Sequence, residues 1–138
     1  MNAVPELLGF DHIHVYVPDR AKAEVWYREV LGFTRVKEFE FWAPDGGPLF
    51  LKSATGGAHV ALFERPVQAC RSVIAFGVNA AAFMQWREHL TRNLKSPLTM
   101  DDHDVSWSLY FHDPDGNPYE ITTYEHDEVS RMLAGAVS

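Results

Sequence analysis

The stretch "FDHIHVYVPDR", residues 10–20, decides the fold. Its apolar residues Ile13, Val15 and Val17 share one side of a period-2 pattern, which is typical of a strand that buries one face. The opposite side of the same strand carries three polar or ionisable side chains, namely His12, His14 and Tyr16. We therefore expect a strand whose back packs on a core and whose front presents chemical groups.

A helix follows this strand directly. Asp19 is a good N-cap, and the apolar residues of "RAKAEVWYREVLGF" recur at helical spacing until Gly32 ends the pattern. Further strands are expected over residues 34–42, 49–53 and 59–64, with "APDGGP" and "ATGG" as turns.

The second half of the chain repeats this order. "SVIAFGVNAAAFMQWREHL", residues 72–90, again alternates apolar residues and then continues as an Asn-capped helix, and "HVALFE" corresponds to the later "EITTYE". This repetition predicts two units of about 60 residues, each a strand, a helix and three more strands. We expect modules over residues 8–66 and 71–125 in a single domain spanning residues 1–138, closed by a short helix over about 127–134.

Composition restricts the function classes. The chain has 138 residues, 46% hydrophobic and 22% charged, as one ordinary globular domain would have. Its net charge of −7 argues against nucleic-acid binding, which depends on Lys and Arg. Because the sequence holds neither a long apolar run nor a signal-peptide pattern, and has the single Cys70, we expect a cytoplasmic protein without a membrane span.

Three stretches together, "DHIHVYVPDR", "WYREVLGF" and "LYFHDPDGNPYEI", resemble the vicinal oxygen chelate superfamily. This superfamily includes glyoxalase I, fosfomycin-resistance transferases, extradiol dioxygenases and bleomycin-resistance proteins. The resemblance covers roughly residues 8–125 and implies an α+β fold in which two βαβββ modules pair their mixed sheets into a cup. In most enzymatic members, that cup holds a divalent metal.

The resemblance also implies a ligand set. His12, seven residues before the Asp that begins the first helix, matches the first family ligand, and Glu120, after "DPDGN", matches the last. A ligand from the last strand of the first module matches His59, with Ala61 on the same strand face as the competing match. The family position on the opening strand of the second module is Val73, which cannot bind a metal, although fosfomycin transferases and extradiol dioxygenases take a ligand there. Two imidazoles and one carboxylate suit Fe, Mn, Ni or Zn better than Ca.

Two further residues are candidate catalytic groups. His14 lies two residues after His12 on the same strand face and is a candidate general base. Tyr110 lies ten residues before Glu120, and the resemblance implies that it hydrogen-bonds a substrate oxygen. The other histidines are interpreted as surface or loop residues: His89, His103, His112 and His126.

Two function classes remain open. The first is a metal-dependent enzyme that acts on a small oxygenated organic substrate by lyase, isomerase or dioxygenase chemistry. The alternative is a metal-free protein that binds an antibiotic or another small molecule, as bleomycin-resistance proteins do. Val73 favours this second class, whereas the presence of both His12 and Glu120 favours the enzyme, which we prefer. Modules of the superfamily pair within one chain or across two, and we expect a homodimer.

Overall fold

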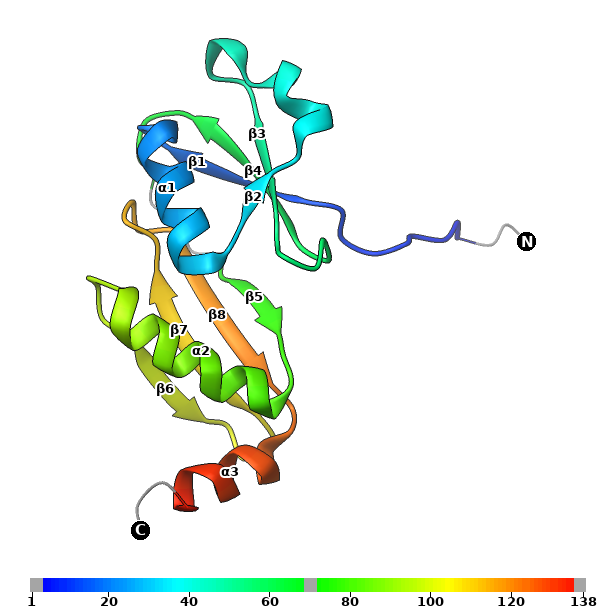
Figure 1. The fold of residues 1–138 in the computed structure, drawn as a ribbon. Coiled ribbons are helices and arrows are strands. Elements are labelled where there is room, and N and C mark those ends of the chain that lie inside the picture. Colours follow the sequence, from blue (N-terminus) through cyan, green and yellow to red (C-terminus); the bar gives the residue numbers. More distant parts are fainter. Residues whose placement is uncertain (1–3, 69–71, 136–138) are drawn as a thin grey trace. The chain divides into compact units, whose positions relative to one another are not determined.

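The computed structural model describes residues 4–68 and 72–135 (Figure 1). The chain divides into two compact units, residues 1–66 and 67–138, and each is described by itself. Cys70 lies outside the described residues. Within the described ranges, no helix is both long and apolar enough to cross a membrane.

The first unit is a four-stranded mixed sheet with one helix on it. Its strands run in the order β1-β4-β3-β2, with β1 and β4 parallel and the other pairs antiparallel. In chain order its elements are β1 (Ile13–Val17), α1 (Arg20–Leu31), β2 (Thr34–Arg35), the 3₁₀ helices η1 (Lys37–Trp42) and η2 (Pro44–Gly46), β3 (Leu49–Lys52) and β4 (His59–Glu64).

The second unit repeats this topology with the strand order β5-β8-β7-β6, and β5 and β8 are parallel. Its elements are β5 (Ile74–Gly77), α2 (Ala80–Asn93), β6 (Thr99–Asp102), β7 (Trp107–His112), β8 (Pro118–Thr123) and α3 (His126–Gly135). The predicted fold class is confirmed: the chain is α+β and contains two βαβββ modules with mixed sheets. The pairing of the two sheets into a cup stays a prediction.

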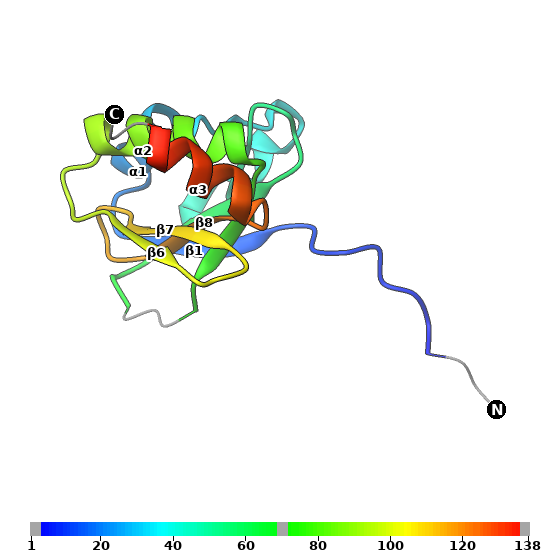
Figure 2. The ribbon, with the colours of Figure 1, turned by 90° about the horizontal axis from the view of Figure 1, so that it is seen from below.

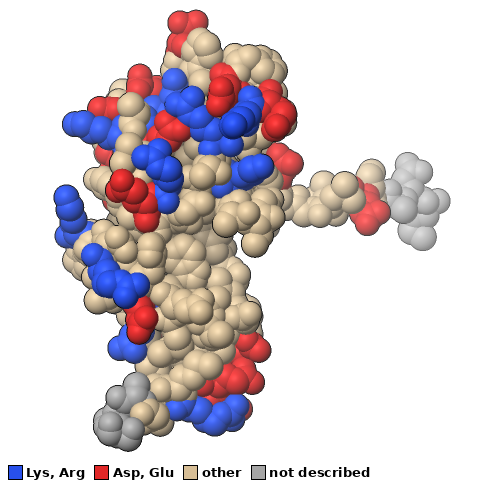
Figure 3. All heavy atoms as spheres, viewed as in Figure 1, with Lys and Arg blue, Asp and Glu red and all other residues tan. Residues whose placement is uncertain are grey.

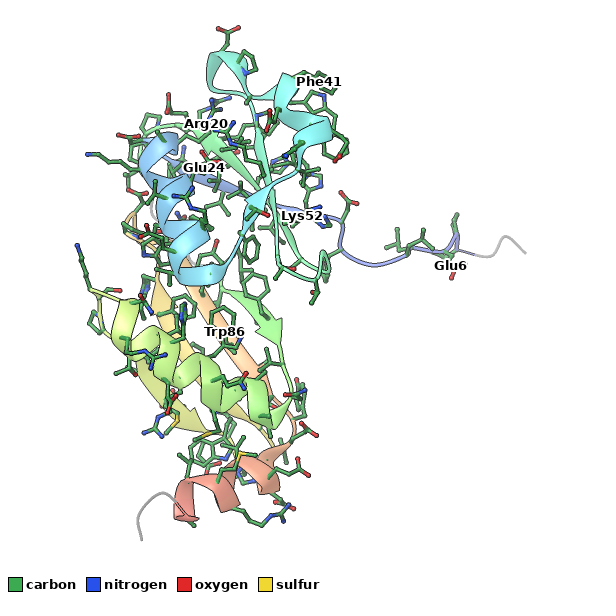
Figure 4. The ribbon with its side chains drawn as sticks, viewed as in Figure 1. Glu6, Arg20, Glu24, Phe41, Lys52 and Trp86 are labelled. Atoms are coloured by element: carbon green, nitrogen blue, oxygen red, sulfur yellow. The ribbon has the colours of Figure 1, made fainter. Side chains whose placement is uncertain are left out.

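Each sheet buries the face that its helix covers, and Figure 2 shows this for the second unit, where α2 and α3 lie on one side of β6, β7 and β8. In the first unit, Asp19 caps α1 by accepting a hydrogen bond from the backbone N–H of Lys22. The residues buried between α1 and the sheet are Val15, Val17, Ala23, Tyr27, Val30, Leu49, Leu51, Val60 and Leu62. Glu24 on α1, labelled in Figure 4, pairs with Arg35 on β2 through two hydrogen bonds and so ties the helix to the far strand.

The prediction of a strand over residues 34–42 is wrong beyond Arg35, because residues 37–42 form η1 instead. Phe41 in this segment is 71% exposed. In the 3₁₀ turn, residues three apart lie above one another, so Phe39 stacks on Trp42 at 4.3 Å between ring centroids. Phe39 and Trp42 both contact Phe50 as well, so these aromatic contacts stabilise a 3₁₀ turn where the second half of a strand was expected.

In the second unit, the "DPDGN" turn is built around one buried carboxylate. Asp113 is 2% exposed, and its Oδ1 accepts hydrogen bonds from the backbone N–H groups of Asp115 and Asn117, both at 2.9 Å. The Asn117 side-chain amide donates to Oδ2 at 2.7 Å. This turn sets where β8 begins, and hence where Glu120 lies on it.

Helix α3 is fastened to the sheet by His126, which the sequence had placed among surface and loop residues. The imidazole stacks on Trp107 and contacts Asp102 at 2.7 Å between Nε2 and Oδ1, while the Trp107 indole N–H donates to Ser130 on α3. The hydrogen bond with Asp102 raises the pKa of His126. Hydrogen bonds from the Asp104 backbone and from His126 lower the pKa of Asp102.

Charged side chains of both signs are interspersed on the face shown in Figure 3. On the first unit, blue and red atoms alternate there over short distances. This face therefore lacks the single-sign basic surface that a nucleic-acid phosphate backbone would need.

We expect Asp113→Ala to lower the free energy of unfolding by about 2–3 kcal/mol, because three N–H donors lose a charged acceptor that is buried with them. Chemical denaturation monitored by circular dichroism measures this change. Asp101→Ala, which removes an exposed carboxylate from β6, is the control and should stay within about 0.5 kcal/mol of wild type. Equal effects of the two variants would contradict the assigned role of Asp113.

We expect His126→Gln to lower the melting temperature most between about pH 4 and 6.5, the window bounded by ordinary Asp and His pKa values. Because folding raises the pKa of His126, its stabilisation is complete below the unfolded-state pKa and is lost as pH rises through the folded-state pKa. On the acid side, the contribution of Asp102 is lost as pH falls through its lowered pKa. Melting curves of wild type and variant across pH measure the difference, with His112→Gln as control.

Candidate functional site

His12 and His14 lie on the face of the first sheet that α1 leaves uncovered. In the strand register, His14 is opposite Ala61 on β4, and Ala61 is opposite Phe50 on β3. Since side chains alternate along a strand, these residues share one face. We call this the open face of the first sheet.

The two histidines contact each other through their ring nitrogens. The Nε2 atoms of His12 and His14 lie 3.1 Å apart, and the rings stack with centroids 5.1 Å apart. The other ring nitrogen of His12, Nδ1, lies 2.6 Å from Oδ2 of Asp11. Because a carboxylate accepts hydrogen bonds, Asp11 keeps the proton on Nδ1 and leaves the lone pair on Nε2. Asp11 was not identified from sequence, where its adjacency to His12 was the only signal.

Aromatic rings surround this histidine pair. His12 packs on Phe50 at 4.8 Å between centroids, and His14 packs on Phe63 at 4.7 Å. Val36, Phe50 and Ala61 form a small buried cluster there, with Phe39 and Phe63 packed against it. Each imidazole therefore rests on one aromatic ring that holds its orientation, while His12 is half-buried and His14 is exposed.

The pairing registers of the two parallel strand pairs show which residue of β4 corresponds to Glu120 of β8. Ile13 pairs with Val60, and its equivalent Ile74 pairs with Tyr119, so Ala61 occupies the ladder position of Glu120. His59 lies two residues earlier on the same face, directly opposite Lys52 of β3. As a metal ligand, His59 stays a prediction.

Glu120 lies on the corresponding face of the second sheet. Ser108, which is fully buried, donates a hydrogen bond to Glu120 Oε2 at 2.7 Å and lies 3.0 Å from the Thr122 hydroxyl. This contact orients the carboxylate. Ser108 was not identified from sequence, because its link to Glu120 depends on the β7–β8 register.

Tyr110 stands directly opposite Glu120 in the β7–β8 ladder. Burial is the main cause that raises the pKa of Tyr110, and the Glu120 charge adds to it. The phenol is therefore protonated at neutral pH and can donate a hydrogen bond. Its oxygen lies 3.1 Å from Nε2 of His103, a residue that the sequence analysis treated as surface or loop.

A separate hollow of about 380 Å³ lies between α2 and strands β6 and β7. Its lining includes Leu90, Leu94, Met100 and Leu109. Leu109 pairs with Ile121, so the hollow is on the helix-covered face of the second sheet and away from Glu120. It is not the candidate site.

The donor chemistry fits a divalent transition metal. His12 offers an unprotonated Nε2 that is backed by a carboxylate, and Glu120 offers an oriented carboxylate, which is the environment that metal ligands commonly have. Val73 is 48% exposed and supplies no donor. Within residues 4–68 and 72–135, no three His, Cys, Asp or Glu side chains are grouped as a metal would require. The predicted ligands are divided between the units: His12 and His59 in the first, Glu120 in the second.

We expect the Tyr110 phenol to titrate above the ordinary tyrosine pKa of about 10, because burial and the Glu120 charge both oppose ionisation. Ultraviolet titration of wild type minus Tyr110→Phe isolates this phenol, and Tyr124→Phe controls for the loss of one exposed tyrosine. When the same difference is measured between Glu120→Gln and the Glu120→Gln, Tyr110→Phe double variant, the pKa of Tyr110 should be lower than in the wild-type background. A Tyr110 component that titrates at or below the ordinary value would contradict this expectation.

Comparison with known proteins agrees with this architecture. Among solved structures, an integron cassette protein from the mobile metagenome of a Halifax Harbour sewage outfall has a TM-score of 0.68 at 21% identity, covering 85% of this chain and 99% of that one. The fosfomycin resistance protein FosX of Listeria monocytogenes, complexed with Mn(II) and sulfate, has a TM-score of 0.67 at 16% identity, covering 93% and 99%. FosX of Mesorhizobium loti has a TM-score of 0.63 at 21% identity, covering 86% and 93%. At these identities, the likenesses show the fold.

A family model describes the same relationship from the sequence. The model of the Glyoxalase/Bleomycin resistance protein/Dioxygenase superfamily matches residues 9–121, which cover nearly all of both predicted modules. The match takes in the opening strand with its two histidines and the "DPDGN" turn before Glu120. The chain therefore belongs to the Glyoxalase/Bleomycin resistance protein/Dioxygenase superfamily.

Proposed function

We propose that this protein is a metal-dependent enzyme of the vicinal oxygen chelate type, acting on a small oxygenated organic substrate. The observation that carries the proposal is the contact of 2.6 Å between Asp11 and Nδ1 of His12. A carboxylate on one ring nitrogen fixes the tautomer that a metal ligand needs on the other and raises its basicity. A histidine that only lined a binding surface would not need this arrangement.

The proposed ligands come from both units. His12 supplies an imidazole nitrogen and Glu120 a carboxylate oxygen, and His59 is the third ligand implied by the family resemblance. When bound, a divalent ion of Fe, Mn, Ni or Zn acts as a Lewis acid toward a substrate that chelates it through adjacent oxygens. The Mn(II) found with Listeria FosX supports a divalent ion as the cofactor of this fold.

The chain's other groups bind and orient the substrate. Tyr110, kept protonated by its raised pKa, donates a hydrogen bond to a substrate oxygen. Ser108 holds Glu120 in one orientation, so that the carboxylate needs little rearrangement when it acts. The rings of Phe50 and Phe63 pack against the imidazoles and offer contact area to the carbon skeleton of the substrate.

A second candidate function has specific support. Val73 replaces a ligand, and the open face of the first sheet is rich in aromatic rings, which is also what a metal-free binding protein of the bleomycin-resistance type would need. In that function, His12, His14 and Glu120 serve as hydrogen-bonding groups.

A homodimeric state and a cytoplasmic location are proposed with either function.

Metal content decides between these two functions. We expect protein purified without tag or chelator to hold close to one Fe, Mn, Ni or Zn ion per chain by elemental analysis, and His12→Ala and Glu120→Ala to lose it. The matched controls are His89→Ala and Glu88→Ala on α2, which should keep the metal. Metal-free wild type that takes up none of these ions in solution would overturn the enzyme proposal in favour of small-molecule binding.

A further inference from the structure

We propose that His14 is a metal ligand that supplies, from the same strand as His12, the nitrogen donor absent at Val73. This inference rests on the proposed function and names one of the ligands of that site. It replaces the general-base role that sequence alone indicated for His14, and in the ligand set His14 takes the place of His59. The observation that carries it is the convergence of two imidazole nitrogens, one from His12 just before β1 and one from His14 within β1.

The separation of these nitrogens matches that of two ligands on one ion. Residues two apart on a strand are about 6–7 Å apart along the backbone. The Nε2 atoms of His12 and His14 nevertheless lie only 3.1 Å apart. Two nitrogens that each lie about 2.1 Å from one ion, at an angle of roughly 90–110°, are separated by roughly 3.0–3.4 Å. The pair therefore has the spacing of a bidentate donor.

The protonation states are compatible with this role. Asp11 holds the proton of His12 on Nδ1, so His12 Nε2 presents a lone pair and His14 Nε2–H donates to it. When a cation takes the place of that shared proton, His14 carries its own proton on Nδ1 and presents a second lone pair. Only the tautomer of one exposed ring changes, which a neutral imidazole accomplishes at little cost.

Packing holds both rings in this arrangement. His12 is fixed against Phe50 and His14 against Phe63, and the buried side chains of Val15 and Val17 anchor the strand from its other face. A ligand pair that is already positioned loses less rotamer entropy on binding than a pair of free side chains would lose.

His59 is less suited to replace the missing ligand. It lies directly opposite Lys52 in the β3–β4 ladder, and the two residues share a sheet face (Lys52 is labelled in Figure 4). Side chains in such pairs have Cβ atoms about 4.5–5.5 Å apart, so the ammonium group opposes a cation at His59. The residue at the ladder position of Glu120 is Ala61, which has no donor.

The strand positions also agree with a relocated donor. Val73 corresponds to His12, and Ala75 corresponds to His14, because Ile13 and Ile74 occupy equivalent ladder positions. The second unit thus has no imidazole at either position, whereas the first has one at both. Placing both nitrogens on β1 keeps two imidazoles and one carboxylate as the donor set with Glu120.

Co(II) binding by the full-length chain tests the assignment. Isothermal titration with Co(II) gives the affinity, and the visible absorption of bound Co(II) reports its ligands without any substrate or activity. The variants are His14→Ala and His14→Gln, with His12→Ala as the positive reference, His59→Ala as the comparison on the same face, and His89→Ala as a control on α2. Circular dichroism and melting temperature verify that each variant is folded.

We expect both His14 variants to bind Co(II) roughly a hundredfold or more weaker than wild type, with an altered spectrum, as His12→Ala should. His59→Ala should stay within about threefold of wild type. Asp11→Asn should weaken binding by about 10- to 100-fold while keeping the spectrum, as loss of an outer hydrogen-bond partner does.

Wild-type affinity and spectrum in both His14 variants, with loss in His12→Ala and His59→Ala, would overturn the assignment and leave the proposed metalloenzyme intact. A wild-type protein that binds no Co(II) would overturn both. Loss in the His14 variants and in His59→Ala together would retain His14 as a ligand and add His59 to the set.

Discussion

The parallel pairing of first and last strand in each unit is the constraint on which the remaining structure depends. A parallel pair requires a crossover, and the helices α1 and α2 begin these crossovers. Each helix covers one face of its sheet, so the other face is open to chemistry. The same pairing sets β1 beside β4 and β5 beside β8, which aligns His14 with Ala61 and Ala75 with Glu120.

The two open faces differ in chemistry although their topology is the same. The first carries imidazoles among aromatic rings, with Phe50 and Phe63 packed on the histidines. The second carries a carboxylate among hydroxyl groups, with Ser108 and Tyr110 beside Glu120. One open face thus offers nitrogen donors and the other an oriented oxygen donor, and divalent transition metals accept both kinds of ligand. Duplication of one module followed by divergence of its open face accounts for such a division.

Neighbours of the candidate ligands indicate function more strongly than the candidates do. An isolated histidine on a strand has many structural explanations, whereas one whose Nδ1–H is held by Asp11 has a defined tautomer. Glu120 likewise gains meaning from the buried hydroxyl that donates to it. Val73 would appear to break the ligand set if each strand position were considered alone. The contact between His12 and His14 supports the proposal that His14 on β1 supplies the donor absent at Val73.

The sequence by itself determined the elements that follow from local periodicity and capping. The alternation around Ile13, the Asp19 cap, the end of α1 at Gly32 and the "DPDGN" turn are each specified by residues close in the chain. Only the tertiary structure decided that residues 37–42 form a 3₁₀ turn, because Phe39 meets Phe50 across the sheet. It also decided that Ala61 is the ladder counterpart of Glu120, that Ser108 and Tyr110 stand beside this carboxylate, and that Phe50 and Phe63 hold the two histidines. These facts depend on strand register, and register follows from burying one whole face of a sheet, which no short window of sequence contains.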